Sequence, residues 1–295
     1  MTETSPPGRI SELITAAAEQ LKARSENPHF EAEVLLSEVL GRNRSYFRAY
    51  GDQILSESQN NAFLDLVQRR QSGQPIAYLL GYREFWRHRF KVSPEVLIPR
   101  HETETLVEAA LEEIRDQTKP SVLDLGTGSG IIAISIGLER RDARVIATDK
   151  SPAALKIAKA NACHLGCGET IRFFEGDWLS AIPKHKRFDL IVSNPPYIAE
   201  DDPHLESGDL QFEPRQALSS GPDGLNDIRK IAQGARHYLK PQGILMIEHG
   251  FNQAKPVKCL LETLGFSAIQ SVQDLAGHLR ITRASYGTPQ ASCTK

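Results

Sequence analysis

The sequence predicts an α/β protein with a mostly parallel seven-stranded sheet, doubly wound with helices on both faces, and a small all-α domain before it. Two observations support this fold class. From about residue 120 onward, short apolar runs alternate with helical patterns, whereas residues from about 9 to 83 show helical periodicity alone. Strand–helix alternation favours parallel strands, because each helix returns the chain to the same edge of the sheet.

The first 83 residues are predicted to form the helical domain, with recognisable helix starts. Asn27-Pro28 combines an N-cap residue with proline at the first helical position, and Gly41 follows the apolar positions of this helix. Ser56 and Gln59 have the spacing of a capping box at the start of another helix. We expect residues 84–100 to form a linking β-hairpin, with apolar runs that begin at Phe85 and continue to 96–100.

The second domain is expected to cover residues 101–286 and to open with a helix from Glu102 to about Asp116. Short runs rich in Val, Ile and Leu, bounded by turn residues, then predict seven strands. Residues 287–295 have the composition of a frayed tail. The expected strands are 122–125, 144–149, 171–175, 190–193, 243–248, 268–272 and 279–282.

Composition excludes several classes of protein. The chain has 35 Lys and Arg against 37 Asp and Glu, and its net charge of −2 gives no general nucleic-acid footprint. No apolar stretch approaches the ~20 residues that span a bilayer. The start of the chain lacks the basic and apolar regions of a signal or transit peptide. We therefore expect a cytoplasmic protein with no membrane partner.

The four cysteines do not have the pattern of a disulfide framework in a chain of 295 residues. Cys163, His164 and Cys167 lie close together in the sequence, but no second cluster of ligands accompanies them. We expect reduced cysteines and no metal site.

A glycine-rich turn comes after the strand at 122–125. Gly126, Thr127, Gly128, Ser129 and Gly130 lead directly into an apolar helix that begins at Ile131. Glycines allow close approach of the backbone to a ligand, and a helix N-terminus favours polar or anionic groups. A dinucleotide fingerprint needs glycine at position 131, so Ile131 argues against a nicotinamide oxidoreductase.

Polar residues also close the next three strands. Asp149 ends the second strand, where a carboxylate can accept both hydroxyls of a ribose. Asp177 and Trp178 follow the third strand and offer a carboxylate and a flat indole beside an adenine, and Asn194 closes the fourth. The carboxyl ends of adjacent strands form the ligand crevice of an open α/β sheet. Together, these positions predict one cofactor site.

Asn194 begins the tetrapeptide Asn194-Pro195-Pro196-Tyr197. The two prolines hold the backbone extended and provide no N–H, so that nearby carbonyls stay available as acceptors. The Asn194 side-chain oxygen and the Pro195 carbonyl can then accept both hydrogens of a planar –NH2 group, with the Tyr197 ring beside it. The alternative interpretation is a rigid turn with a core tyrosine.

These features resemble the class I S-adenosylmethionine-dependent methyltransferases, and the tetrapeptide resembles the subset that methylates exocyclic or amide nitrogens. Further segments resemble the HemK-type protein-(glutamine-N5) methyltransferases, which modify peptide chain release factors. The similarity extends over about residues 30–283, with departures at His101, where the family usually has proline, and Leu279, where a polar residue is common. The segments that carry it are 75–81, 85–86, 97–104, 213–214, 217–218, 221–225, 248–250 and 274–278.

The resemblance implies S-adenosyl-L-methionine as cofactor, S-adenosyl-L-homocysteine as product and class-1 peptide chain release factors as protein substrate. It implies catalytic roles for Asn194, Pro195 and Tyr197, with Pro196 completing the substrate site. The helical domain and hairpin would grip the release factor, and we expect a monomer. The cofactor residues that it implies are Gly126, Thr127, Gly128, Ser129, Gly130, Asp149, Asp177, Trp178 and Asn194.

The chief rival is an amino methyltransferase of adenine or guanine in DNA or RNA, because a flipped base presents a similar –NH2 group. The segment 198–227 contains eight acidic residues and one arginine, Arg215, whereas an enzyme acting on nucleic acid is expected to carry Lys and Arg there. We therefore expect no direct nucleic-acid partner. The alternative interpretation is that the segment is a solvated loop whose charge does not indicate the substrate. A non-catalytic binding module is also possible, but it gives no role to the two acceptors that the tetrapeptide offers to an –NH2 group. The role of Arg100, toward the cofactor or as a brace of the hairpin, stays open.

Overall fold

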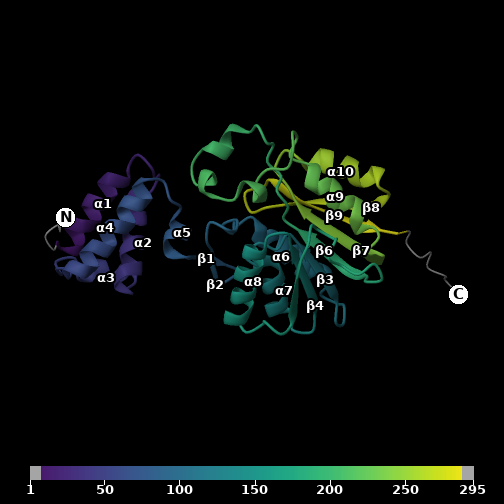
Figure 1. Cartoon of the computed structure of the whole chain (residues 1–295), viewed down its shortest axis with the longest axis horizontal. Helices are drawn as coiled ribbons and strands as arrows, with labels where there is room; N and C mark the ends of the chain where they lie inside the picture. The colour runs from purple at the N-terminus through teal and green to yellow at the C-terminus, as the bar shows by residue number, and fades with distance from the viewer. Residues whose placement is uncertain (1–7, 288–295) are drawn as a thin grey trace. The chain divides into compact units, whose positions relative to one another are not determined.

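The structure is a computed structural model that describes residues 8–287. Packing divides the chain into two units, and the boundary falls between Tyr82 and Arg83. The first unit is helical (Figure 1). Its helices are α1 (Ile10–Leu21), α2 (Pro28–Leu40), α3 (Arg44–Ala49), α4 (Glu57–Gln71) and α5 (Ile76–Leu80).

Local signals in the first unit set the helix bounds. Pro28 occupies the first position of α2, and Gly41 ends it in the left-handed conformation, at φ +60°. The Ser56 side chain accepts a hydrogen bond from Gln59 N, at 3.3 Å, in the expected capping box. The apolar faces of α1, α2 and α4 then close one core around residues such as Phe63. The prediction of a small all-α part is confirmed.

The hairpin starts earlier than the sequence suggests. Its strands are β1 (Tyr82–Phe85) and β2 (His88–Lys91), and residues 96–100 form no strand. Ile98 N donates instead to the Glu213 carboxylate, at 2.9 Å, and Pro99 has no N–H. These two residues therefore have no donor left for a neighbouring strand.

The second unit contains the expected seven-stranded sheet, in the order β5-β4-β3-β6-β7-β9-β8. It is parallel except for β9, which runs antiparallel to both of its neighbours. The chain leaves β3 toward β5 and then returns to the other side of β3, so the strand order reverses between β3 and β6. The strands are β3 (Ser121–Leu125), β4 (Arg144–Asp149), β5 (Ile171–Glu175), β6 (Phe188–Ser193), β7 (Leu239–Glu248), β8 (Phe266–Gln273) and β9 (Leu279–Tyr286).

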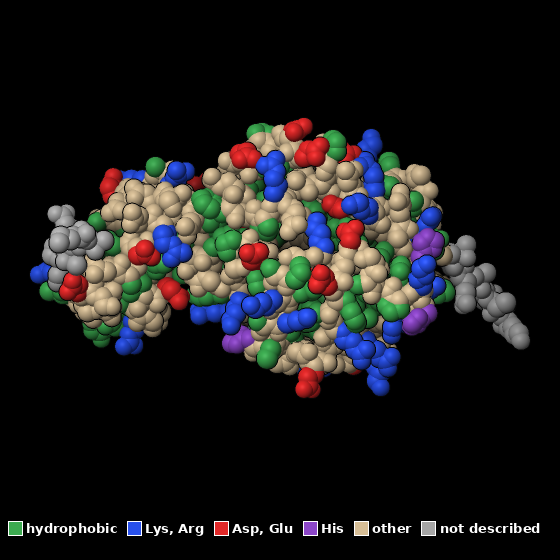
Figure 2. Space-filling model, viewed as in Figure 1, with side chains coloured by type: hydrophobic (Ala, Val, Ile, Leu, Met, Phe, Trp, Pro, Cys, Tyr) green, Lys and Arg blue, Asp and Glu red, His purple; other side chains and the backbone are tan. Residues whose placement is uncertain are grey.

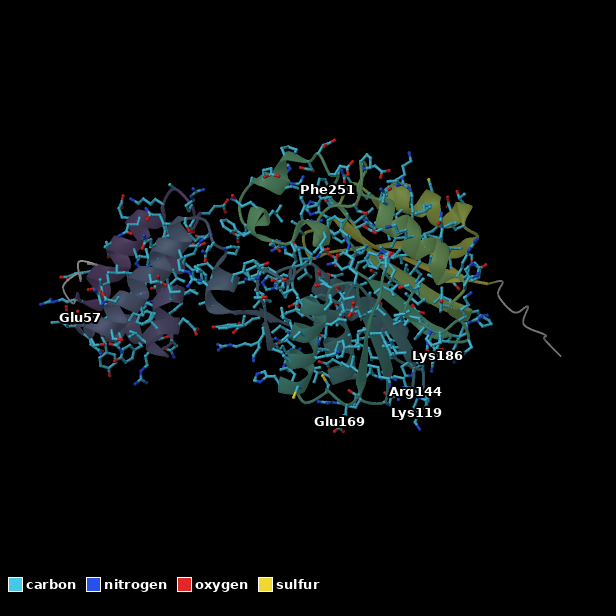
Figure 3. The ribbon with its side chains drawn as sticks, viewed as in Figure 1. Glu57, Lys119, Arg144, Glu169, Lys186 and Phe251 are labelled. Atoms are coloured by element: carbon cyan, nitrogen blue, oxygen red, sulfur yellow. The ribbon has the colours of Figure 1, made fainter. Side chains whose placement is uncertain are left out.

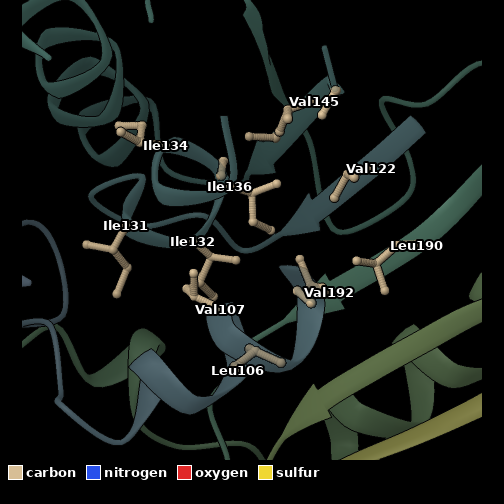
Figure 4. Close-up of a cluster of buried hydrophobic side chains, with 14 of the residues drawn as sticks. Leu106, Val107, Val122, Ile131, Ile132, Ile134, Ile136, Val145, Leu190 and Val192 are labelled. Atoms are coloured by element: carbon tan, nitrogen blue, oxygen red, sulfur yellow. The ribbon is translucent and has the colours of Figure 1, made fainter. Parts of the chain in front are cut away.

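Both faces of this sheet are covered, because successive residues of a strand point to opposite sides. Val122 and Val192 pack in the core that contains side chains of α6 (Thr103–Glu113), α7 (Ile131–Glu139) and α8 (Pro152–His164) (Figure 4). Their neighbours Leu123 and Ile191 pack in the core that contains side chains of α9 (Asn226–Ala235) and α10 (Ala254–Thr263). The doubly wound architecture is thus confirmed.

The two ends of the sheet carry different residues. Lys119, Arg144 and Lys186, which precede or begin strands, lie at one end, and Phe251, which comes after β7, lies at the other (Figure 3). Three short 3-10 helices, η1 (Pro203–Glu206), η2 (Leu210–Phe212) and η3 (Arg215–Ala217), occur in the long segment between β6 and α9. Across residues 8–287, no helix is both long and apolar enough to cross a membrane.

Candidate active site

The turn after β3 owes its shape to glycine. Gly126 and Gly128 have φ of +73° and +56°, in the left-handed region that favours this residue. A Cβ at Gly126 would lie 2.8 Å from Cζ3 of Trp178, so only a residue without a side chain lets the indole pack there. The backbone N–H groups of Gly126 and Thr127 both donate to the Thr148 carbonyl, each at 2.9 Å, and this joins the turn to β4.

A buried carboxylate that the sequence reasoning missed lies beneath this turn. Asp124 Oδ2 accepts hydrogen bonds from Thr127 Oγ1, at 2.6 Å, and from Ala133 N, at 3.2 Å. Asp124 therefore ties the turn to the start of α7. Burial raises its pKa to about 7. The signal that could have identified Asp124 from the sequence is its place as an acidic residue within an otherwise apolar strand.

Asp149 and Trp178 are held in place by specific contacts. The Asp149 carboxylate accepts from Gly128 N, at 2.8 Å, and from Ser151 N, at 2.9 Å. Trp178 has φ of +52°, and its indole N–H donates to Asp227 at the start of α9, at 3.2 Å. The neighbouring backbone and side chains thus fix both groups before any ligand binds, which is the preorganisation that a binding site requires.

A cavity of about 900 Å³, its open mouth included, is formed at this edge of the sheet. Its volume lies in the range of small-molecule sites. Gly130 does not line it: this residue caps α7 at φ +89°, and a Cβ there would lie 2.7 Å from Cδ1 of Ile134. The residues from the sequence prediction that line the cavity are Gly126, Thr127, Gly128, Ser129, Asp149, Asp177, Trp178, Asn194 and Pro196.

A second, smaller cavity of about 340 Å³ adjoins the tetrapeptide. Pro195 and Tyr197 line this cavity and not the larger one, while Asn194 and Pro196 line both. Leu210 and Leu218 give it apolar walls. Asn194 therefore lies where the two cavities meet. A group bound in the larger cavity and a group bound in the smaller one can come into contact beside the Asn194 side-chain amide.

Tyr197 is fixed through its backbone and is largely buried. Its carbonyl accepts from Gln253 Nε2, at 2.9 Å, and its N–H donates to the Leu218 carbonyl, at 3.2 Å. Gly224 packs so closely that a Cβ there would overlap the Tyr197 carbonyl. Burial raises the pKa of the Tyr197 phenol, so the ring is neutral and serves as a surface.

Arg100 lines both cavities and forms an ion pair with Glu213. The Glu213 side chain is fully buried and also accepts from Ile98 N. Burial raises the pKa of Glu213, against the opposing effect of the Arg100 charge. The pair therefore ties the segment after β6 to residues 98–100, a contact that the sequence did not predict, and the place of Arg100 in the lining of the larger cavity is compatible with the first of the two roles left open for it.

The acidic segment 198–227 carries less free charge than its composition suggests. Four of its eight carboxylates form ion pairs with Arg or Lys, through Glu206, Glu213, Asp223 and Asp227. Figure 2 shows basic side chains among the acidic ones along the upper rim of the larger unit. Charge alone therefore says little about which substrate approaches this segment.

Comparison with known proteins gives a match for each part of the chain. Residues 12–81 match the family model described as "PrmC N-terminal domain", and residues 102–211 match "Methyltransferase small domain". A release factor glutamine methyltransferase of Burkholderia pseudomallei is 48% identical over 275 residues, which are 92% of this chain and 95% of that relative. One of Vibrio cholerae is 44% identical over 95% of this chain and 97% of its own length.

The chain belongs to the release factor glutamine methyltransferase family. The resemblance inferred from its motifs is thereby confirmed, and the protein is an enzyme that transfers methyl groups.

Solved structures support the fold of this release factor glutamine methyltransferase family member. The 16S rRNA N2 G1207 methyltransferase of Thermus thermophilus aligns with a TM-score of 0.53 at 19% identity, over 70% of this chain and 49% of that one. The hMettl16 catalytic domain aligns with a TM-score of 0.56 at 15% identity, over 77% and 83%. At these identities the likeness concerns the fold alone.

Proposed function

We propose that this enzyme transfers a methyl group from S-adenosyl-L-methionine to the side-chain amide nitrogen of the glutamine in the Gly-Gly-Gln motif of class-1 peptide chain release factors. Membership of the family supports the substrate, since the relatives are named for the release factor glutamine. The position of Asn194 between a large cavity and a smaller one is the observation that carries the chemistry.

The residues of the larger cavity fit S-adenosyl-L-methionine. The glycine turn allows the Trp178 indole to pack on Gly126 and leaves open space at Gly128, and Asp149 provides carboxylate oxygens for a ribose. When bound, the cofactor supplies a methyl group on a positively charged sulfonium and is converted to S-adenosyl-L-homocysteine. The residues that would hold it in the larger cavity are mainly Gly126, Gly128, Asp149, Asp177 and Trp178.

The tetrapeptide holds the acceptor. Asn194 Oδ1 and the Pro195 carbonyl are free of donors among the described residues, so both are available to the two hydrogens of a glutamine amide. An amide nitrogen is a poor nucleophile, because its lone pair is shared with its carbonyl. Two acceptors on the N–H groups orient that lone pair and favour the positive charge that develops on nitrogen during transfer. The apolar walls of the smaller cavity strengthen both hydrogen bonds.

The enzyme's surroundings are also part of the proposal. It acts as a cytoplasmic monomer, with the release factor as its partner and no direct contact with nucleic acid. The helical unit and the hairpin grip the body of the release factor. The relatives' names do not favour the rival activity on a nucleic-acid base.

Methyl transfer from labelled S-adenosyl-L-methionine tests the substrate. Three acceptors are compared: a purified release factor, the same factor with its Gly-Gly-Gln glutamine replaced, and total nucleic acid. We expect label on the intact factor alone, and label confined to nucleic acid would contradict the proposal.

Asn194→Ala tests the site. We expect turnover to fall by about three orders of magnitude, equivalent to roughly 4 kcal/mol, while the cofactor dissociation constant changes less than about fivefold. A variant that keeps near-normal turnover would remove Asn194 from the amide site.

A further inference from the structure

A buried carboxyl group is linked to Asn194 through the hydroxyl of Thr103. Glu248 is the last residue of β7 and is 1% exposed. Its Oε1 accepts a hydrogen bond from Thr103 Oγ1, at 3.2 Å, and its Oε2 has no hydrogen-bond partner among the described residues. A buried acid whose polar contacts are the Thr103 hydroxyl and the nearby Asn194 amide is costly, which calls for an explanation beyond packing.

Thr103 connects this carboxyl to the tetrapeptide. Its hydroxyl carries one hydrogen, and an ionised Glu248 can only accept, so that hydrogen points to Glu248. The hydroxyl oxygen is then left to accept from Asn194 Nδ2, at 3.1 Å. With Nδ2 engaged in this way, Asn194 Oδ1 must face the opposite direction.

We propose that Glu248, acting through the Thr103 hydroxyl, sets the direction of the Asn194 amide and is a positioning residue for methyl transfer. The inference rests on the proposed function of Asn194 as the acceptor of a substrate N–H. An amide that points the other way would present Nδ2 to the substrate nitrogen, and two sets of donors would face each other. The two orientations of the Asn194 amide have nearly equal shape. The hydrogen-bonded chain Glu248–Thr103–Asn194 thus selects the one that presents Oδ1 to the substrate.

The protonation state of Glu248 decides whether this selection operates. Burial raises its pKa to about 7, while the Thr103 hydrogen bond, the charge of Arg280 and the Asn194 amide act in the opposite direction. Glu102 adds a like charge, and the buried Tyr197 phenol stays neutral. Below this pKa the carboxyl can itself donate to Thr103, whose hydrogen is then released and no longer fixes the Asn194 amide. Turnover should therefore rise with pH as Glu248 ionises.

Thr103→Val and Thr103→Ser form the first test, in the full-length enzyme with a release factor as substrate. Valine keeps the volume and removes the hydroxyl, so kcat should fall about 30-fold, or roughly 2 kcal/mol. Serine restores the hydroxyl and should return kcat to within about threefold of the wild type. The dissociation constants for S-adenosyl-L-homocysteine and for the release factor, measured by calorimetry, should stay within about threefold in both variants.

These two variants separate positioning from packing. Unchanged kcat in Thr103→Val would overturn the inference, and so would a loss that serine does not restore or one matched by weaker cofactor binding. The wild type serves as the reference in the same assay: if it fails to label the release factor, the proposed function fails and not this inference.

Glu248→Gln provides a second test with a readout besides activity. The wild-type pH profile of kcat should show an acidic limb near the pKa of Glu248, and this limb should be missing in Glu248→Gln. Infrared difference spectra of the free enzymes should show two protonated carboxyls, Glu248 and Asp124, that ionise near neutral pH in the wild type, and only the Asp124 band should remain in the variant. An acidic limb that persists in Glu248→Gln would overturn the assignment.

Discussion

The turn after β3 and the tetrapeptide after β6 follow neighbouring strands of one sheet, yet they hold their shapes in different ways. The turn depends on the conformation of its own glycines, with Gly126 and Gly128 at positive φ, and on hydrogen bonds to the adjacent strand β4. The tetrapeptide depends on groups from distant parts of the chain, since Thr103 and Gln253 contact Asn194 and Tyr197. The cofactor side thus rests mainly on glycine conformation and its neighbouring strand, whereas the acceptor side rests on side chains from distant parts of the chain, so variants should impair the two sides separately.

Gly126→Ala should give the largest effect on the cofactor side. The new Cβ meets the Trp178 ring and forces strain at φ +73°, so the wall of the larger cavity must move. We expect the dissociation constant for S-adenosyl-L-methionine to rise about 30-fold, or roughly 2 kcal/mol, in calorimetry. Gly166→Ala is the matched control, because Gly166 also has φ +73° but no atom within 4 Å of the added Cβ. Equal effects of the two substitutions would assign the change to backbone strain alone.

Gly224→Ala should impair the acceptor side instead. Gly224 has φ +72°, and a Cβ there overlaps the Tyr197 carbonyl, which must shift together with the tetrapeptide. Steady-state assays should show kcat reduced about tenfold, or roughly 1.4 kcal/mol, with cofactor affinity within about threefold of the wild type. If this variant weakened cofactor binding as much as Gly126→Ala does, the two sides would not be separable.

Glu213→Gln tests how the segment after β6 is held against the smaller cavity. It leaves the Arg100 charge without its buried partner, and this loosens residues that line the cavity. The KM for the release factor should rise about fivefold, or roughly 1 kcal/mol. Glu206→Gln removes one partner of an exposed pair with Arg215 and should change the KM less than twofold, as about 0–1 kcal/mol is typical of such pairs. A larger effect of Glu206→Gln would reverse this ranking.

The last prediction concerns the free energy of unfolding rather than activity, and it follows from the burial of Glu248 on the acceptor side. The folded-state pKa of Glu248 is about 7 against an ordinary value of 4.5. Because this pKa is raised, the folded state holds the proton more tightly, and that stabilisation is lost as pH rises from the ordinary value through 7. The difference corresponds to roughly 3 kcal/mol.

Thermal unfolding checks this sign. Between about pH 5 and pH 8, the wild type should lose several degrees of Tm relative to Glu248→Gln. Because Asp124 is present in both proteins, its own ionisation cancels in the comparison. A wild type that gained stability relative to the variant over this range would show that the pKa of Glu248 is not raised.

Much of the fold follows from local patterns. The runs at 144–149 and 171–175 became β4 and β5 with the expected bounds, because apolar runs between turn residues have few alternatives. The strand ends were harder to predict, as in β7, which starts at Leu239 rather than 243. The expected strand at 96–100 was wrong, since the carboxylate that takes the Ile98 N–H is 115 residues away. The tail after residue 287 lies outside the described residues.

The sequence by itself determined the fold class and the glycine turn, together with the Asn-Pro-Pro-Tyr segment at a strand end. Periodicity, proline and positive-φ glycine act on the chain within a few residues, so their effects can be predicted from neighbours. Only the tertiary structure decided that Thr103 and Glu248 form a hydrogen-bonded chain with Asn194, that Glu213 pairs with Arg100, and that Gly130 caps α7 and does not line the cavity. Such contacts depend on which strands become neighbours. Their energy comes from the burial of polar groups, which exists only once the sheet has formed and its faces are covered.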